Sequence, residues 1–173
     1  RGITYDEKEL TENPYLIAES DKGLFNDKGD IISPRIPLDI VDQALIPTFN
    51  YLNKYQLDED RRIRAIMIEV LTKSSREGDT LLSLHDVIIK TKDRFPGERA
   101  CIPDPYLINQ NKTFYEQRLE FIGDNNEFIA LKEMRNFERE VSGFIKKIID
   151  FEDNTSSVQP EWENLLNEHI GKV

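Results

Sequence analysis

The stretch that most constrains the fold is residues 127–151, EFIALKEMRNFEREVSGFIKKIIDF. We expect it to begin as a short strand and to continue as a long helix. Six large apolar side chains recur at alternating steps of three and four residues, which places them along one side of a helix. They are Met134, Phe137, Val141, Phe144, Ile148 and Phe151. The charged residues fall mostly on the other side, so the helix needs a partner surface. The pattern alone also fits an ordinary core helix with a solvated back.

The composition is that of a folded chain, because its 173 residues are 38% hydrophobic and its apolar positions are grouped in periodic segments. Apolar runs are only a few residues long, so we expect no membrane contact. The chain begins with Arg1, which favours a processed or excised piece of a longer protein. A single cysteine, Cys101, excludes an internal disulfide or a Cys-based zinc site and fits a reducing, cytoplasmic setting.

The net charge of −10 argues against a protein coated with phosphate contacts, but the charge is unevenly distributed. Residues 86–118 carry a net charge of +1, so this window is the candidate surface for nucleic acid. A mixed, solvated surface is the alternative. The basic residues of the window, which are our candidate DNA contacts, are Lys90, Lys92, Arg94, Arg99, Lys112 and Arg118.

Residues 1–57 form the first predicted part, which is irregular and helical. We expect residues 1–35 to be largely irregular, with one helical turn that begins near Pro14 and a loop over residues 21–33. Residues 36–55 predict a helix interrupted at Pro47, because proline cannot donate to the preceding turn.

Residues 58–151 form the second predicted part. A helix over residues 58–77 begins with Asp58 as its cap and ends before Gly78. A short strand over residues 80–82 leads to a helix that is capped by Ser83 and stops near Phe95. A third helix follows within residues 103–118, with Pro105 in its first turn. Two apolar runs around Gly123-Asp124-Asn125-Asn126 then predict a hairpin within residues 119–131.

This order of elements is that of a winged helix. The predicted fold class is therefore mainly α with a small β-hairpin (α+β), with a winged-helix-like module and a long C-terminal helix. The expected core comprises Ile63, Met67, Val70, Val87, Ile88, Leu107, Phe121, Ile129 and Phe137. In a DNA-reading winged helix, residues 105–118 would enter the major groove and residues 120–128 would contact the backbone. Glu120 and Glu127 make this wing electrostatically poor for phosphate, so scaffold use of the fold stays open.

The third predicted part, residues 152–173, is an acidic linker followed by a short helical piece around Trp162, Leu165 and Leu166. The chain has no Walker A loop and no HExxH motif, and His85 and His169 each stand alone. We find no catalytic constellation, and we expect this chain to hold neither a cofactor nor a metal.

Three segments together resemble the N-terminal region of RecD-type DNA helicases, the exodeoxyribonuclease V alpha-subunit-like members of helicase superfamily 1. They are ENPYLIAES (12–20), DEDRRIRAIMIEVLTKSSREGDTLLSLHDVIIKTKDRF (58–95) and NEFIALKEMRNFEREVSGFIKKII (126–149). In that family an ENPY-type segment leads into helix-hairpin-helix elements, and a helical module with an EGxTxL-type turn follows. Residues 21–33 depart from the family pattern, because they do not reproduce its Gly-rich hairpin.

The resemblance implies that this chain is a non-catalytic region of an ATP-dependent DNA helicase or helicase-nuclease of DNA repair and recombination. It also implies a motor domain beyond Val173 that binds ATP and Mg²⁺ and carries out hydrolysis. The partners it implies are DNA, single-stranded or at a junction, and the motor domain of the same chain, against which the long helix would pack. A protein-interaction scaffold is the alternative, and a stand-alone transcriptional regulator is the least favoured.

Overall fold

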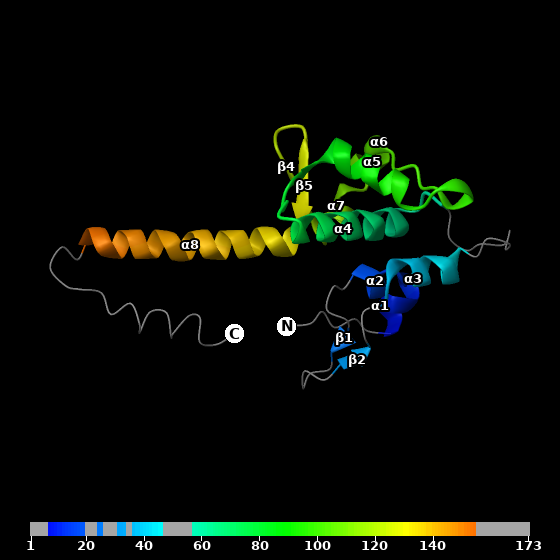
Figure 1. Cartoon of the computed structure of the whole chain (residues 1–173), viewed down its shortest axis with the longest axis horizontal. Helices are drawn as coiled ribbons and strands as arrows, with labels where there is room; N and C mark the ends of the chain where they lie inside the picture. Colours follow the sequence, from blue (N-terminus) through cyan, green and yellow to red (C-terminus); the bar gives the residue numbers. More distant parts are fainter. Residues whose placement is uncertain (1–6, 20–23, 26–30, 34–35, 47–56, 155–173) are drawn as a thin grey trace. The chain divides into compact units, whose positions relative to one another are not determined.

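The structure, a computed structural model, describes residues 7–19, 24–25, 31–33, 36–46 and 57–154 (Figure 1). It is mainly helical with a small antiparallel sheet of three strands, as the sequence predicts for the fold class. The chain divides into two compact units, residues 1–135 and residues 136–173. None of the described helices is long and apolar enough to cross a membrane.

The N-terminal part is more regular than its polar sequence predicts. Helices α1 (Glu7–Glu12) and α2 (Leu16–Glu19) flank Pro14, and strands β1 (Leu24–Phe25) and β2 (Ile31–Ser33) pair antiparallel. The prediction of irregular structure is therefore wrong at α1, and the prediction of a continuous loop over residues 21–33 is wrong at the two strands. Each strand contains only two adjacent apolar residues, which is too few to show the alternation of apolar and polar residues by which a strand is predicted.

Helix α3 (Leu38–Leu45) follows Pro37, whose fixed backbone suits the position before a helix. The helix ends at Leu45 with Ile46 as its C-terminal cap, so it stops before Pro47, where the sequence predicts the interruption. The second half of the predicted segment, residues 47–55, lies outside the described residues.

Helix α4 (Asp60–Arg76) is the centre of the first unit. Its predicted apolar stripe is buried, and it comprises Ile63, Ile66, Met67, Val70 and Leu71. Gly78 follows the helix with φ +107°, the left-handed conformation expected of a glycine after a helix end. The predicted cap is wrong. Glu59 precedes the helix without a side-chain cap, and the Asp58 carboxylate accepts a hydrogen bond from the Ile102 backbone N–H at 2.7 Å.

Strand β3 (Leu82–Ser83) begins two residues later than predicted and leads directly into helix α5 (Leu84–Arg94). The predicted cap of α5 is confirmed, because the Ser83 hydroxyl accepts a hydrogen bond from the Asp86 N–H at 3.0 Å. A 3₁₀ turn, η1 (Gly97–Arg99), follows the end of the helix at Phe95.

The predicted third helix consists of two short helices, α6 (Pro105–Gln110) and α7 (Lys112–Tyr115). Asp104 caps α6 by accepting a hydrogen bond from the Tyr106 N–H at 2.8 Å. The break falls at Asn111, which has φ −100° and ψ 23°. Asparagine is a weak helix former whose side chain competes for backbone hydrogen bonds, so a break within this polar run is physically reasonable.

Strands β4 (Leu119–Ile122) and β5 (Phe128–Leu131) form the predicted hairpin. The sheet order is β3-β5-β4, so β5 lies in the middle and pairs antiparallel with both neighbours. At the wing between β4 and β5, Gly123 has φ +94° and Asn126 has φ +56°, conformations that glycine and asparagine tolerate best. Elements α4 to β5 thus have the order and strand pairing of a winged helix (Figure 1).

The core of the first unit includes most of the residues predicted for it. Ile63, Met67, Val70, Val87 and Ile129 are buried, and Ile88 and Phe121 pack against them while partly exposed. Leu107 is exposed and its neighbour Ile108 is buried instead, because the helix containing them is short and its phase cannot be read from the sequence. Phe137 is 50% exposed and does not belong to the buried set.

Helix α8 (Lys132–Asn154) begins directly after β5, which confirms the predicted change from strand to helix within residues 127–151. The helix extends from the end of the first unit through the first part of the second. Its apolar face is substantially exposed at Phe137, Val141, Ile145 and Ile149.

Candidate nucleic-acid interface

Helix α5 carries the first two predicted DNA contacts, Lys90 and Lys92, and both are exposed. Lys90 Nζ lies 3.4 Å from the Ser74 hydroxyl at the C-terminal end of α4. Residues two apart on a helix face different directions, so the two lysines do not form one patch by themselves. Lys90 instead lies beside the C-terminal end of α4, where that helix packs against α5.

Arg94, at the end of α5, binds two carboxylates. Its Nε lies 2.5 Å from Glu69 Oε2, and one Nη lies 2.9 Å from Asp39 Oδ2. The hydrogen bond to Glu69, opposed by partial burial and reinforced by Asp39, raises the pKa of the guanidinium above its ordinary value. Arg94 therefore ties α5 to α3 and α4, and its charge is locally compensated.

Arg99, Lys112 and Arg118 are likewise engaged within the fold. Arg99 forms an ion pair with the buried carboxylate of Asp42. Lys112 Nζ donates to the Asn126 side-chain oxygen at 2.8 Å and lies 3.5 Å from Glu116 Oε1. The charges of Arg99 and Lys112 are therefore both paired with neighbouring groups of the first unit.

Arg118 donates to the backbone carbonyl of Glu19 at 3.1 Å and lies 4.0 Å from its carboxylate. The six predicted contacts thus do not converge on one surface. Lys90 and Lys92 are the two that the structure leaves exposed, and the other four are partly buried and bound to groups of the first unit.

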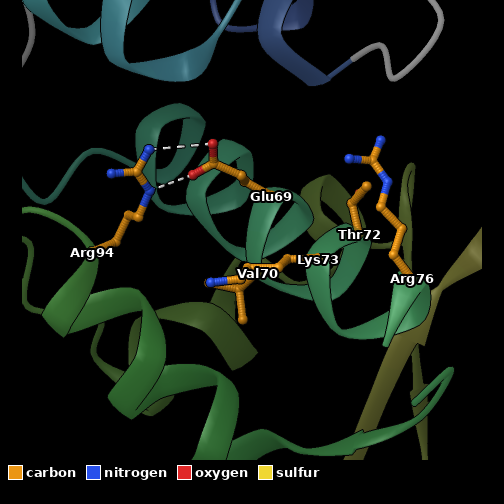
Figure 2. A pocket seen from close by; sticks show the side chains of 6 residues that line it. All are labelled: Glu69, Val70, Thr72, Lys73, Arg76 and Arg94. Atoms are coloured by element: carbon orange, nitrogen blue, oxygen red, sulfur yellow. Dashed lines mark hydrogen bonds and ion pairs between the residues drawn. The ribbon is translucent and has the colours of Figure 1, made fainter. Parts of the chain in front are cut away.

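A pocket of about 410 Å³ lies along α4, and sequence reasoning did not anticipate it (Figure 2). It is lined by Glu69, Val70, Thr72, Lys73, Arg76 and Arg94. Five of these residues lie on α4 at helical spacing, and Arg94 reaches the pocket from α5, where its ion pair with Glu69 forms one wall. Lys73 and Arg76 are exposed.

Lys73 and Arg76 were missed because they precede the basic window, within a segment of mixed charge. Their spacing of three residues in the last turn of a helix was the available signal, since such residues share a face and cations are favoured at a helix C-terminus. With Lys90 beside Ser74, the structure places three exposed cations around the C-terminal end of α4. This set, Lys73, Arg76 and Lys90, is called the α4 cation cluster below.

The wing is tied to the helix that would enter a DNA groove. The Asn126 side-chain amide donates to the Asn109 side-chain oxygen at 3.2 Å, and Asn126 also accepts from Lys112. On α6, Tyr106 is 66% exposed and accepts a hydrogen bond from the Gln110 amide at 2.8 Å. The elements that would face a DNA groove in a DNA-reading winged helix therefore present amide and aromatic groups, and Lys112 among them is bound to Asn126.

Two buried arginines, also missed by sequence reasoning, join the N-terminal part to α4. Arg62 binds both carboxylate oxygens of Asp42 on α3, at 2.6 and 3.2 Å, and Tyr15 donates to the same carboxylate at 3.0 Å. Burial alone would raise the pKa of Asp42, but hydrogen bonds from Arg62, Arg99 and Tyr15 lower it overall. The carboxylate is therefore held in its charged form.

Arg64 makes the equivalent contact with α2. It binds the buried Glu19 carboxylate at 2.9 and 3.2 Å, and a third nitrogen donates to the Phe114 carbonyl and the Gln117 side chain. Its guanidinium carbon also lies 3.9 Å from the centroid of the Phe114 ring. Arg62 and Arg64 together fix the N-terminal helices α2 and α3 to α4 of the winged-helix-like module. These contacts hold α4 in place, and with it any surface that α4 carries.

Other chemistry is limited in the described part of the chain. No three His, Cys, Asp or Glu side chains among the described residues are grouped so that they could hold a metal ion. Cys101 is buried, and burial raises the pKa of its thiol to about 11. Comparison with known proteins finds no matching family model, no matching curated protein and no matching solved structure.

Proposed function

We propose that this chain is a non-catalytic, DNA-guiding region of an ATP-dependent DNA helicase or helicase-nuclease. The observation that carries the proposal is the α4 cation cluster, which adjoins a pocket on a module with winged-helix order. The resemblance of three segments to the N-terminal region of RecD-type helicases supports the same conclusion. The motor that would bind ATP and Mg²⁺ belongs to the parent protein in this proposal.

Backbone contact is the mode of binding that the cluster supports. Lys73, Arg76 and Lys90 can each approach a phosphate, but they have no fork geometry directed at a base edge. Binding through them is independent of sequence and weakens as salt rises, because each phosphate contact releases counterions. Lys92 is also exposed on α5, but it faces a different direction from Lys90 and lies outside the cluster.

The helicase assignment is tested with the intact parent protein. We expect ATP hydrolysis that is stimulated by single-stranded DNA, and we expect none from the 173-residue chain. The variant Lys90→Glu/Lys92→Glu should need more DNA for half-maximal stimulation while its maximal turnover stays unchanged. An intact parent without ATP turnover would rule out a helicase, and an unchanged DNA requirement would remove these lysines from the interface.

A protein-interaction scaffold is the second candidate function. It is favoured by the acidic wing and by an exposed apolar group on and before α6, namely Ile102, Tyr106 and Leu107. Exposed apolar residues next to polar ones are typical of protein contacts. Absence of DNA binding at low salt, together with loss of partner binding in Tyr106→Ala, would favour this function over the first.

A further inference from the structure

The surface on and before helix α6 exposes three large apolar side chains. Ile102 is 64% exposed, Tyr106 66% and Leu107 45%. They fall within six consecutive residues, so their Cα atoms lie within about 18 Å of one another. The Gln110 amide donates to the Tyr106 hydroxyl at 2.8 Å, which holds the ring in place. This set, Ile102, Tyr106 and Leu107, is called the α6 apolar group below, and its exposure is typical of a contact surface.

Exposed carboxylates border the α6 apolar group and are joined to it by hydrogen bonds. The Asp58 carboxylate accepts from the Ile102 backbone N–H at 2.7 Å, and the Asp104 carboxylate accepts from the Tyr106 backbone N–H at 2.8 Å. Among the described residues, neither carboxylate forms an ion pair. Asp60, at the start of α4, accepts at 2.6 Å from the side chain that follows α6. These carboxylates therefore order the backbone of the group and place negative charge at its edge.

Positive charge does not offset this negative edge. Residues 100–111 contain no lysine or arginine. The cations of the surrounding segments are each paired with another carboxylate: Arg61 with Glu59, Arg99 with Asp42, and Lys112 with Glu116. The α6 apolar group is therefore an apolar centre with an acidic rim, the general arrangement of a protein contact surface that favours a basic partner.

We propose that the α6 apolar group binds a protein segment that presents an apolar side chain between lysines or arginines. Charge complementarity selects this occupant. Nucleic acid would bring phosphates against the carboxylates, and a second copy of a chain with net charge −10 would bring further negative charge. The inference rests on the second candidate function, protein interaction, and names the chemistry of the partner. It uses none of the α4 cation cluster, so it is independent of DNA guidance.

The test uses two synthetic helical peptides, one with leucine on one face and lysine on the other, and one with glutamate in place of each lysine. The lysine peptide should shift the NMR amide signals of residues 102–111 in the isotope-labelled chain, and the glutamate peptide should not. Tyr106→Ala should weaken binding of the lysine peptide about tenfold, as truncation of an aromatic anchor does. Asp58→Asn/Asp104→Asn keeps both acceptor oxygens and should weaken binding about fivefold, because two exposed charge contacts are lost.

Matched control variants make the same kinds of change elsewhere in the first unit. Ile89→Ala shortens an exposed apolar side chain on α5, which is 44% exposed. Glu77→Gln/Asp79→Asn removes two exposed negative charges beyond the other end of α4, about 24 Å along that helix from Asp60. This separation exceeds the screening length of about 8 Å at physiological salt. Both controls should keep the wild-type affinity for the lysine peptide, and circular dichroism should show equal helix content for all variants.

Three results would overturn the proposal, and they fail in different places. A lysine peptide that does not bind, or that shifts only signals elsewhere, would remove the α6 surface from the second candidate function as well. A glutamate peptide that binds as tightly would overturn only the basic partner, and the contact surface would stand. Single-stranded DNA that shifts the signals of residues 102–111 would make nucleic acid the occupant. None of these results bears on the α4 cation cluster, because every variant retains its three residues.

Discussion

Replacement of Asp42 by alanine should destabilise the first unit more than almost any other single change, because it strands a buried positive charge. The side chains of Asp42 and Arg62 are both fully buried, and their ion pair joins α3 to α4. In Asp42→Ala, Arg62 keeps its hydrogen bonds to the carbonyls of Leu57 and Arg99, at 2.8 and 2.7 Å, but has no counter-charge.

The expected loss is about 3–5 kcal/mol of unfolding free energy, the usual cost of removing one partner from a buried ion pair. Two further losses support the upper part of this range. The buried Tyr15 hydroxyl would lose its hydrogen bond to Asp42, and Arg99 would lose its carboxylate partner. With a urea dependence of roughly 2 kcal/mol per molar, this is a shift of about 2 M in the unfolding midpoint.

The double variant Asp42→Leu/Arg62→Met distinguishes two effects: the loss of the ion pair itself, and the cost of leaving Arg62 buried without a counter-charge. Two apolar side chains of similar volume remove both charges together, and such replacements are often neutral within a few kcal/mol. We therefore expect the double variant to be more stable than Asp42→Ala. Urea unfolding followed by circular dichroism gives all the free energies, and Lys8→Ala is the control because its ion pair with Glu12 is exposed.

An Asp42→Ala variant that loses less than about 1 kcal/mol would refute this reasoning, because a stranded buried charge cannot cost so little. A double variant less stable than the single variant would refute it as well. The pair would then stabilise the fold by more than its own desolvation costs, and the argument from an uncompensated charge would fail.

Further predictions concern pH, the thiol and a helix cap. Because folding lowers the pKa of Asp42, the ionised carboxylate stabilises the folded state above about pH 4, and this contribution is lost as pH falls through the folded pKa. In Asp42→Asn, the free energy of unfolding should therefore fall less steeply in acid titrations. Cys101, with its pKa raised to about 11, should react with a thiol reagent at pH 8 far more slowly than in urea, and equal rates would contradict its burial. Ser83→Ala should cost about 1 kcal/mol by urea unfolding, whereas Ser142→Ala, on the exposed side of α8, should cost none.

Local features of the sequence were sufficient to predict the central elements of the fold. The apolar stripe of α4, the glycine after it, the Ser83 cap and the hairpin before α8 each depend on residues close together in the chain. The winged-helix order follows from these elements taken in sequence. The break at Asn111 was missed because a four-residue polar run fits either a continuous helix or a kinked one.

The features that the sequence could not predict depend on partners far apart in the chain. Arg62 and Arg64 look like solvated charges on a charged helix, and only the fold places Asp42, 20 residues away, and Glu19, 45 residues away, against them. For the same reason, Arg94 and Arg99 looked available for DNA although acidic groups from α3 bind both of them. In the α4 cation cluster, Lys73 and Arg76 share one helix, and only the fold places Lys90 of α5 at the same end of α4, beside Ser74.

The most direct test of the central claim, that the α4 cation cluster guides DNA, is fluorescence anisotropy with a labelled single strand over a range of salt. We predict that Lys73→Glu/Arg76→Glu weakens binding and lowers the slope of log affinity against log salt by about 1.4, since each phosphate contact contributes about 0.7. The control Lys8→Glu/Lys146→Glu, with the same change of net charge, should retain the wild-type slope. No binding at low salt, or equal slopes for the cluster variant and the wild type, would contradict the claim.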